Sequence, residues 1–247
     1  MLADIIFPDM DGPTLRSSRQ RTGLTQAQLA GLLGVTQPYL SMLENGSRPV
    51  PNRLAHRLAE VLDTLPTDLP VEASPGTLPA PSSAELVDEL SSLNYPGFAY
   101  LRRGKARVNP AQLLLSALAA EALDARLAEA LPWLLLRFDQ LDTEFLVREA
   151  KLSDLQNKLG FVVALARQVA ERNPMFRGRL AELHGLEQRL DRSRLVREHT
   201  FGPREKTPKL TSWVRDHRSS LAKHWNVLSD LRTEDLPYAA QDSGAMA

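Results

Sequence analysis

The segment LTQAQLAGLLGVTQPYLSMLENG, residues 24–46, carries polar side chains where a merely solvated helix would carry Glu or Lys. It contains two short helical patterns in succession, separated by Gly34. The second pattern begins with Thr36, Gln37 and Pro38, whose hydroxyl, amide and ring can offer hydrogen bonds and apolar contact at a surface. The segment therefore packs, recognises another molecule, or does both.

Side chains typical of an enzyme or a metal site are not arranged in recognisable patterns. His184, His199, His217 and His224 are scattered, and no paired-ligand spacing links them to acids. The sequence contains no cysteine, which excludes disulfides, thiolate metal ligands and cysteine nucleophiles. Phosphate-binding loop, serine-hydrolase and dinucleotide-binding motifs are also absent from the sequence. We expect no enzyme activity, no cofactor and no metal.

The composition fits a globular protein. Of the 247 residues, 43% are hydrophobic, and Lys+Arg and Asp+Glu each number 30, so net charge alone excludes no class of partner. The start, MLADIIFPDMDG, lacks a basic region followed by a long apolar run, so we expect no secretory signal. No stretch offers the roughly 18 consecutive apolar residues of a membrane span. We expect a soluble cytoplasmic protein with no membrane association.

A proline-rich stretch divides the chain. Residues 66–83, PTDLPVEASPGTLPAPSS, contain five prolines and no apolar period, which is typical of a semi-extended linker. We therefore predict an N-terminal arm at residues 1–13, a first domain at 14–65, a linker at 66–82, a second domain at 83–236 and a disordered tail at 237–247.

The second domain is helical by pattern. Leu86 and Leu90 share one face of a first helix, and Asn109 is a typical N-cap for another. Pro132 should break or restart a third helix, and a further helix should begin near Ser153. No alternating strand pattern of comparable strength is present. We therefore expect an all-α fold.

The first domain shows the local signals of two linked helices. Thr25 and Thr36 can cap the two helices, Gly34 supplies a tight turn between them, and Asn45-Gly46 is typical of a helix end. The residues expected to pack between the helices are Leu29, Ala30, Leu33, Val35, Leu40 and Leu43. The simplest alternative, a short bundle with a chance turn, leaves the outer face of the second helix unexplained.

These spacings strongly resemble the helix-turn-helix of the lambda-repressor and Cro family over residues 14–65. The resemblance implies that the second helix of the motif enters the major groove of double-stranded DNA with its N-terminal residues at base edges. The implied base-reading residues are Thr36, Gln37, Pro38, Ser41 and Met42. Gln37 can pair with adenine, while Pro38 and Met42 can contact a thymine methyl group.

The same resemblance implies contacts to the DNA backbone. Gln26 matches a position that donates to phosphate, and Tyr39 either contacts phosphate through its hydroxyl or packs its ring into the domain. The residues at 45–48 match positions that present backbone N–H groups and a basic side chain to phosphates; they are Asn45, Gly46, Ser47 and Arg48. We interpret Glu44 as a structural partner.

Positive charge is concentrated in the first domain. Between residues 15 and 58 the only acid is Glu44, and the basic residues are Arg16, Arg19, Arg21, Arg48, Arg53 and Arg57. We predict phosphate contacts for Arg16 and Arg19, because the first helix crosses the DNA backbone in such folds, and a solvated position for Arg53 and Arg57. Residues 177–232, with thirteen basic and seven acidic residues, are a second candidate surface for DNA or an acidic protein.

These observations predict a transcriptional regulator, namely a repressor that binds an inverted repeat as a homodimer. We expect the second domain to hold the dimer together through leucine-marked helices at about residues 142–172 and 177–198. Part of this domain weakly resembles domains of helix-turn-helix antitoxins paired with nucleotidyltransferase-type toxins, so one alternative is an antitoxin that binds a protein toxin. Another is a repressor that senses a small molecule in a pocket lined by Trp133, Phe138, Phe145 and Phe161.

Overall fold

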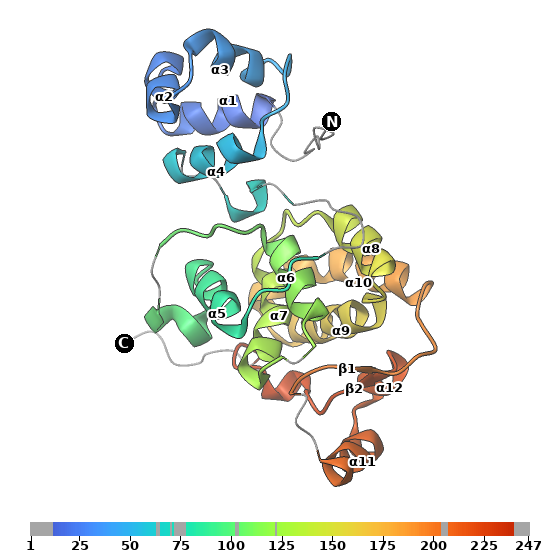
Figure 1. Ribbon diagram of the computed structural model, residues 1–247. Coiled ribbons are helices and arrows are strands. Elements are labelled where there is room, and N and C mark those ends of the chain that lie inside the picture. The colour runs from blue at the N-terminus through green and yellow to red at the C-terminus, as the bar shows by residue number, and fades with distance from the viewer. Residues whose placement is uncertain are drawn as a thin grey trace.

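The computed structural model describes residues 12–62, 65–69, 71, 78–101, 104–121, 123–203 and 207–239. Most of the expected N-terminal arm and the end of the expected tail therefore lie outside the described residues. The chain forms a small N-terminal helical body and a larger helical body (Figure 1). Regular structure in the described residues is almost entirely helical, which confirms the all-α expectation.

The small body consists of four helices around its own core. Its helices are α1 (Gly12–Arg21), α2 (Gln26–Leu33), α3 (Gln37–Glu44) and α4 (Asn52–Val61). The core is built from leucines of all four helices, among them Leu15, Leu29, Leu33, Leu40, Leu43 and Leu58. Burial of these side chains supplies most of the favourable free energy that a body of this size can gain.

Local signals set the ends of α2 and α3. Thr25 and Gln28 form a reciprocal capping box at the start of α2. Gly34 follows α2 in the left-handed conformation, with φ 67°, which a residue without a Cβ adopts at little cost. The Thr36 hydroxyl then accepts a hydrogen bond from the Tyr39 amide and caps α3. The turn between α2 and α3 is therefore short and defined.

The start of the expected semi-extended linker is docked at residues 66–69 and 71, while residues 70 and 72–77 lie outside the described residues. Residues Pro66–Asp68 form the short 3-10 helix η1, and Leu69 and Val71 are buried. The Nδ2 of Asn109 donates to the carbonyl oxygens of Thr67 (3.0 Å) and Leu69 (2.7 Å). Two apolar residues among prolines give no periodic pattern, so the sequence alone did not reveal this docking.

The larger body is built around one long buried helix, α9. The helices of this body are α5 (Ser83–Ser92), α6 (Pro110–Ala119), α7 (Ala125–Arg137), α8 (Thr143–Leu152), α9 (Gln156–Arg172), α10 (Leu180–Asp191), α11 (Pro208–His217) and α12 (Ser220–His224). Short 3-10 helices lie at η2 (Pro96–Leu101), η3 (Pro174–Arg179) and η4 (Thr233–Asp235). Helices α7 and α10 pack against α9, while α11 protrudes from the body (Figure 1).

Two short strands were not expected from the sequence. Strand β1 (His199–Thr200) pairs in parallel with β2 (Val227–Leu228), with His199 opposite Val227. Two-residue strands are too short for an alternating pattern to be detected. The pairing connects the segment before α11 with the segment after α12.

Pro132 lies inside α7 and does not break it, contrary to the expectation. Proline removes the donor that would reach the carbonyl of Ala128 and disfavours the helix interior. Here the neighbouring residues Leu131, Leu134 and Leu135 are all buried in the core, and their packing outweighs that local cost. The expected start near Ser153 agrees with the structure, because α8 ends at Leu152 and α9 begins at Gln156.

The described start of the expected tail is also docked. The Tyr238 hydroxyl donates to the carbonyl oxygen of Glu129 (2.6 Å), and Asn173 Nδ2 donates to the Tyr238 carbonyl oxygen (3.2 Å). The Tyr238 ring packs edge-on against Tyr95. Residues 237–239 therefore belong to the larger body, and 240–247 lie outside the described residues.

The larger body uses its long helices and aromatic side chains internally. The leucines of α10 at positions 183, 186 and 190 are buried in the same core as α9. The helices expected to form a dimer surface therefore bury these apolar side chains inside one chain. Trp133 packs against Tyr95 and Phe138, and Phe161 packs against Phe201. Phe145 is also buried in this core, so all four aromatic residues take part in the packing, and a ligand pocket lined by them stays a prediction.

No helix within the described ranges is both long enough and apolar enough to span a bilayer.

Candidate nucleic-acid interface

Helix α3 presents a buried face to its own domain and an exposed face to solvent. Leu40 and Leu43 are fully buried against the core shared with α1 and α2. The predicted base-reading residues lie on the other side, where Thr36, Gln37, Pro38 and Met42 are exposed and Ser41 is half-buried. The structure therefore brings the five predicted residues together on one surface around the start of α3.

The first turn of α3 leaves Gln37 as its available hydrogen-bonding side chain. The Thr36 hydroxyl is engaged as the N-cap, and Pro38 occupies the first turn, where a missing N–H costs nothing. The Gln37 amide makes no hydrogen bond to any described residue. An exposed carboxamide, which both donates and accepts, can form two hydrogen bonds with one adenine.

The backbone N–H groups after α3 are already used within the domain, which corrects the expectation that they face phosphates. The amide of Asn45 donates to the Ser41 carbonyl (3.0 Å), and that of Gly46 donates to the Leu43 carbonyl (3.1 Å). The amides of Ser47 and Arg48 donate to the Met42 carbonyl, at 2.9 and 3.3 Å. Helix ends satisfy their last carbonyls in this way. The side chains of Asn45, Ser47 and Arg48 remain for an external partner.

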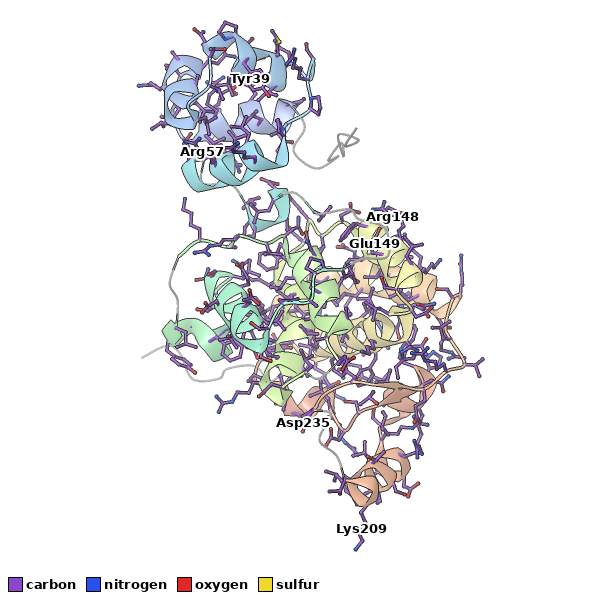
Figure 2. The ribbon with its side chains drawn as sticks, in the orientation of Figure 1. Tyr39, Arg57, Arg148, Glu149, Lys209 and Asp235 are labelled. Carbon is purple, nitrogen blue, oxygen red and sulfur yellow. The ribbon has the colours of Figure 1, made fainter. Side chains whose placement is uncertain are left out.

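The Tyr39 ring packs partly against the small body, and the predicted contact of its hydroxyl with phosphate stays a prediction. The ring is half-buried and contacts the core of the small body. The Arg48 guanidinium lies over that ring, 5.8 Å from its centroid, at a separation typical of a cation–π contact. Figure 2 shows Tyr39 within the small body and Arg57 on α4. Tyr39 therefore positions Arg48 next to the end of α3.

Arg19 is an internal residue and not a phosphate contact, contrary to the prediction. Its Nε donates to Glu44 Oε1 (2.6 Å), its Nη2 donates to Oε2 (3.1 Å), and its Nη1 donates to the Leu24 carbonyl (2.7 Å). The side chains of Arg19 and Glu44 are only 10% and 1% exposed. Because these donors are engaged and shielded from solvent, they are not available to DNA.

Gln26 completes the same cluster. Its Nε2 donates to Glu44 Oε2 at 2.9 Å, so α1, α2 and α3 are all bound to one carboxylate. Burial opposes ionisation of Glu44, but the hydrogen bonds from Arg19 and Gln26 together outweigh burial and hold the pKa of this carboxyl below its ordinary value. Glu44 is therefore the structural partner that the sequence predicted. The geometry of Gln26 is consistent with orienting α2, while its predicted phosphate contact stays a prediction.

The remaining arginines give the small body a basic surface. Once Arg19 and Glu44 neutralise each other, the exposed basic residues are Arg16, Arg21, Arg48, Arg53 and Arg57. Arg57 donates to the Leu32 carbonyl (3.4 Å), and Arg21 lies 3.9 Å from Asp68 and donates to Ser18. A surface with this excess of positive charge attracts a phosphate backbone irrespective of base sequence.

Gly12 is a positioning residue that the sequence did not reveal. A Cβ at this position would lie 2.5 Å from the carbonyl oxygens of both Leu43 and Glu44. The start of α1 therefore approaches the end of α3 more closely than any other residue type permits. A glycine before a helix has many explanations, so no local pattern signals this contact.

The side chains of three histidines of the larger body have partners in the protein, one of them an acid, and the Nε2 of His199 is buried without a hydrogen-bond partner among the described residues. His224 contacts Asp191 (2.8 Å), His184 contacts Gln188 (2.9 Å), and His217 contacts the Trp213 carbonyl (2.8 Å). Among the residues that the structure describes, no three His, Cys, Asp or Glu side chains are grouped as metal ligands.

The small body is a helix-turn-helix domain. Residues 12–70 match the family described as helix-turn-helix domain, a range that starts at Gly12 and runs past η1, beyond the 14–65 predicted from spacing. No curated protein and no solved structure was found to match the chain. A helix-turn-helix domain with an exposed, polar second helix suggests a DNA-binding regulator of transcription.

Proposed function

We propose that this protein is a transcriptional repressor that binds a specific inverted repeat in double-stranded DNA as a homodimer. The observation that carries the proposal is the unpartnered amide of Gln37 at the exposed start of α3. The helix itself is held in place at its other end, at Glu44. The Arg19–Glu44–Gln26 cluster binds α3 to α1 and α2. The helix that carries Gln37 is held in this way, so binding to a base would need to order only the Gln37 side chain and not the backbone beneath it.

Recognition would place the N-terminal half of α3 in the major groove. Gln37 would pair with one adenine through both its oxygen and its nitrogen, which discriminates against other bases by about 1–3 kcal/mol. Pro38 and Met42 would contact thymine methyl groups, because both are exposed and apolar on the same surface. Thr36 and Ser41 would make secondary contacts near the same base pairs.

Phosphate contacts would fix the orientation of α3 without reading sequence. Arg16 is exposed on α1, and Arg48 is exposed beside the end of α3, where Tyr39 holds it. The side chain of Asn45 donates to Ser41 at 3.4 Å, a weak contact that a phosphate oxygen can replace. These side chains take the place of the backbone N–H groups that the structure engages internally.

Dimer formation would supply the second half-site. One small module touches few bases, so specific affinity generally needs two half-sites about one helical turn apart. We place the contact on α11 of the larger body, because Leu210 and Trp213 are 44% and 51% exposed there. Val214, one turn after Leu210, is buried and anchors the helix to the body. Exposed apolar side chains grouped on one helix are typical of an interaction surface.

The proposal is tested by selecting bound sequences from a random duplex library with the purified full-length protein at moderate salt. We expect an enriched motif with two inverted half-sites, and the same selection with Gln37→Ala should lose preference at one position in each half. Gln20→Ala is the matched control, because Gln20 is an exposed glutamine of α1 outside the predicted base-reading surface. Enrichment of no motif by the wild-type protein would refute the proposal.

A second candidate function is that of an antitoxin, favoured by the same apolar face of α11. In this case a protein toxin, and not a second copy of the chain, would cover Leu210 and Trp213. The test is co-expression with the product of the neighbouring gene, followed by purification on that product. Co-purification of the wild type but not of Trp213→Ser, together with a monomeric free chain, would favour the antitoxin.

A further inference from the structure

A cavity of about 320 Å³ lies in the larger body between α5, α6 and the segment that precedes α5. Its volume falls at the lower end of the roughly 300–1,000 Å³ that small-molecule sites occupy. Its apolar lining comes from Pro79 and Pro81 on one side and from Val108 and Leu113 on the other. None of the side chains that line it belongs to the DNA-binding surface described above.

An unpartnered hydroxyl lines the interior of this cavity. Ser116 of α6 is only 3% exposed, and its Oγ makes no hydrogen bond to the protein. A serine in mid-helix commonly bonds to the carbonyl four residues earlier, but here that bond is not formed. Leaving a buried hydroxyl without a partner costs about 1–3 kcal/mol. A ligand with a polar atom at its inner end would recover that cost.

Carboxylates dominate the polar part of the lining. Glu85, Asp88 and Glu89 contribute three acids, against the single guanidinium of Arg107. Glu85 is engaged in the cap of α5 through Ser82, and Glu89 accepts the backbone N–H groups of Arg107 and Val108. The Asp88 carboxylate has no partner among the described residues. It is exposed, so it lies at the solvent side of the cavity.

We infer that this cavity binds a small organic cation: a protonated amine joined through an apolar body to a hydroxyl or similar polar group. The ammonium group pairs with Asp88 at the solvent side, the apolar body packs between Leu113 and the two prolines, and the inner polar group bonds to Ser116. The three-to-one excess of carboxylates selects a cation over an anion of the same shape. The inference does not depend on the proposed DNA binding.

The test uses tyramine as the probe, because it carries an ammonium group, an aromatic body and a phenolic hydroxyl. The full-length protein with ¹³C-labelled methyl groups is titrated with tyramine and followed by NMR. We expect saturable shifts of the Val108 and Leu113 methyl signals. Two comparison compounds separate the contributions: 3-(4-hydroxyphenyl)propionate replaces the ammonium by a carboxylate, and phenethylamine lacks the hydroxyl.

Variants assign each end of the probe. Asp88→Asn should weaken tyramine binding about two- to fivefold, the loss expected for one solvent-exposed ion pair, whereas Asp139→Asn, an exposed carboxylate outside the cavity, should have no effect. Ser116→Ala should abolish the preference for tyramine over phenethylamine. The inference is overturned if the propionate binds as tightly as tyramine, if the two Asp variants behave alike, or if the shifts fall on methyl groups outside the cavity.

Discussion

Arg19 and Glu44 form a buried ion pair that joins the first helix of the DNA-binding domain to the end of its recognition helix. Two parallel hydrogen bonds, of 2.6 and 3.1 Å, connect the guanidinium to the carboxylate. Bidentate pairs of this kind fix geometry as well as charge. Because the pair lies behind α3, and Gln26 joins it from α2, the orientation of the exposed residues at the start of α3 depends on this cluster.

Removing Arg19 should destabilise the helix-turn-helix domain strongly. Arg19→Met leaves the Glu44 carboxylate buried without its main partner, which typically costs about 3–5 kcal/mol. Hydrogen–deuterium exchange of the amides in α1–α3 measures this loss without requiring the larger body to unfold. Arg16→Met is the matched control, because Arg16 is exposed, and its exchange should remain close to that of the wild type. The double variant Arg19→Met/Glu44→Leu should recover most of the loss; a double variant no better than Arg19→Met would contradict this account.

The same pair should make the stability of the domain depend on pH. The pKa of Glu44 is lower in the folded protein than its ordinary value, so its stabilising contribution is fully present above the unfolded pKa of about 4.3. That contribution is lost as pH falls through the folded pKa, where the carboxyl becomes protonated. Urea unfolding followed by NMR signals of residues 12–62 should show decreasing stability below about pH 4.3. Glu44→Gln should be less stable at pH 7 and should lose less stability on acidification; equal slopes for the two proteins would exclude Glu44 as the cause.

Gln37 and Arg16 should contribute to DNA binding in different ways. Gln37→Ala should weaken the free energy of binding to the operator by about 1–3 kcal/mol. It should have little effect on binding to an operator variant in which the base read by Gln37 is already replaced. Arg16→Ala should weaken binding to all sequences alike and lower the salt slope by about one phosphate contact. Fluorescence anisotropy on the selected operator and on single-base variants, measured at several salt concentrations, separates the two effects. Uniform weakening by Gln37→Ala would show that this residue does not read a base.

A methyl group at Gly12 should separate α1 from the end of α3. Gly12→Ala places a Cβ against two backbone carbonyls that cannot rotate away, so either α1 shifts or its first turn unwinds. We expect faster exchange of the first amides of α1 and weaker operator binding. Gly31→Ala is a sharp control, because a Cβ there meets no atom within 4 Å and alanine favours the helix by roughly 0.5–1 kcal/mol. Two variants with the same effect would argue against the close contact.

Sequence reasoning succeeded where the physical cause is local. Thr25, Gly34 and Thr36 set the ends of α2 and α3 through hydrogen bonds and dihedral angles within a few residues, so their pattern predicted both helices and the exposed surface of α3. The all-α class followed from helical periodicity in the same way. These features depend only on residues that are close in the sequence, so the sequence alone is enough to predict them.

Predictions failed where the cause is tertiary. Arg19 has the same chemistry as Arg16, and only the position of Glu44, 25 residues away, directs it inward. Val71 and Tyr238 are single apolar residues in polar or proline-rich segments, and surfaces that form elsewhere in the chain bury Val71 fully and Tyr238 partly. Pro132 was expected to end a helix because local propensity was considered without the surrounding leucines. Contacts between residues that are distant in the sequence cannot be predicted from local patterns alone.

Substitution of the exposed apolar residues of α11 should dissociate the proposed dimer. Leu210→Ser/Trp213→Ser removes two large apolar side chains from a helix that protrudes from the body (Figure 1), while buried Val214 still anchors it. We expect sedimentation velocity to show a dimer for the wild type and a monomer for the double variant. Leu152→Ser is the matched control, because Leu152 is a comparably exposed leucine at the end of α8, and it should leave the dimer intact.

The dimer prediction also has a consequence for DNA binding. The α11 variant keeps every residue of the DNA-binding surface, so its affinity for a single half-site should equal that of the wild type. Its affinity for the full inverted repeat should fall by about 10²–10⁴-fold, because the second half-site is no longer bound as part of one assembly. Equal loss on half-site and full operator would instead indicate damage to the helix-turn-helix domain. If the α11 variant is still a dimer, the dimer contact lies on another surface. If the wild-type chain is monomeric, the result favours the antitoxin alternative, in which α11 binds a different protein.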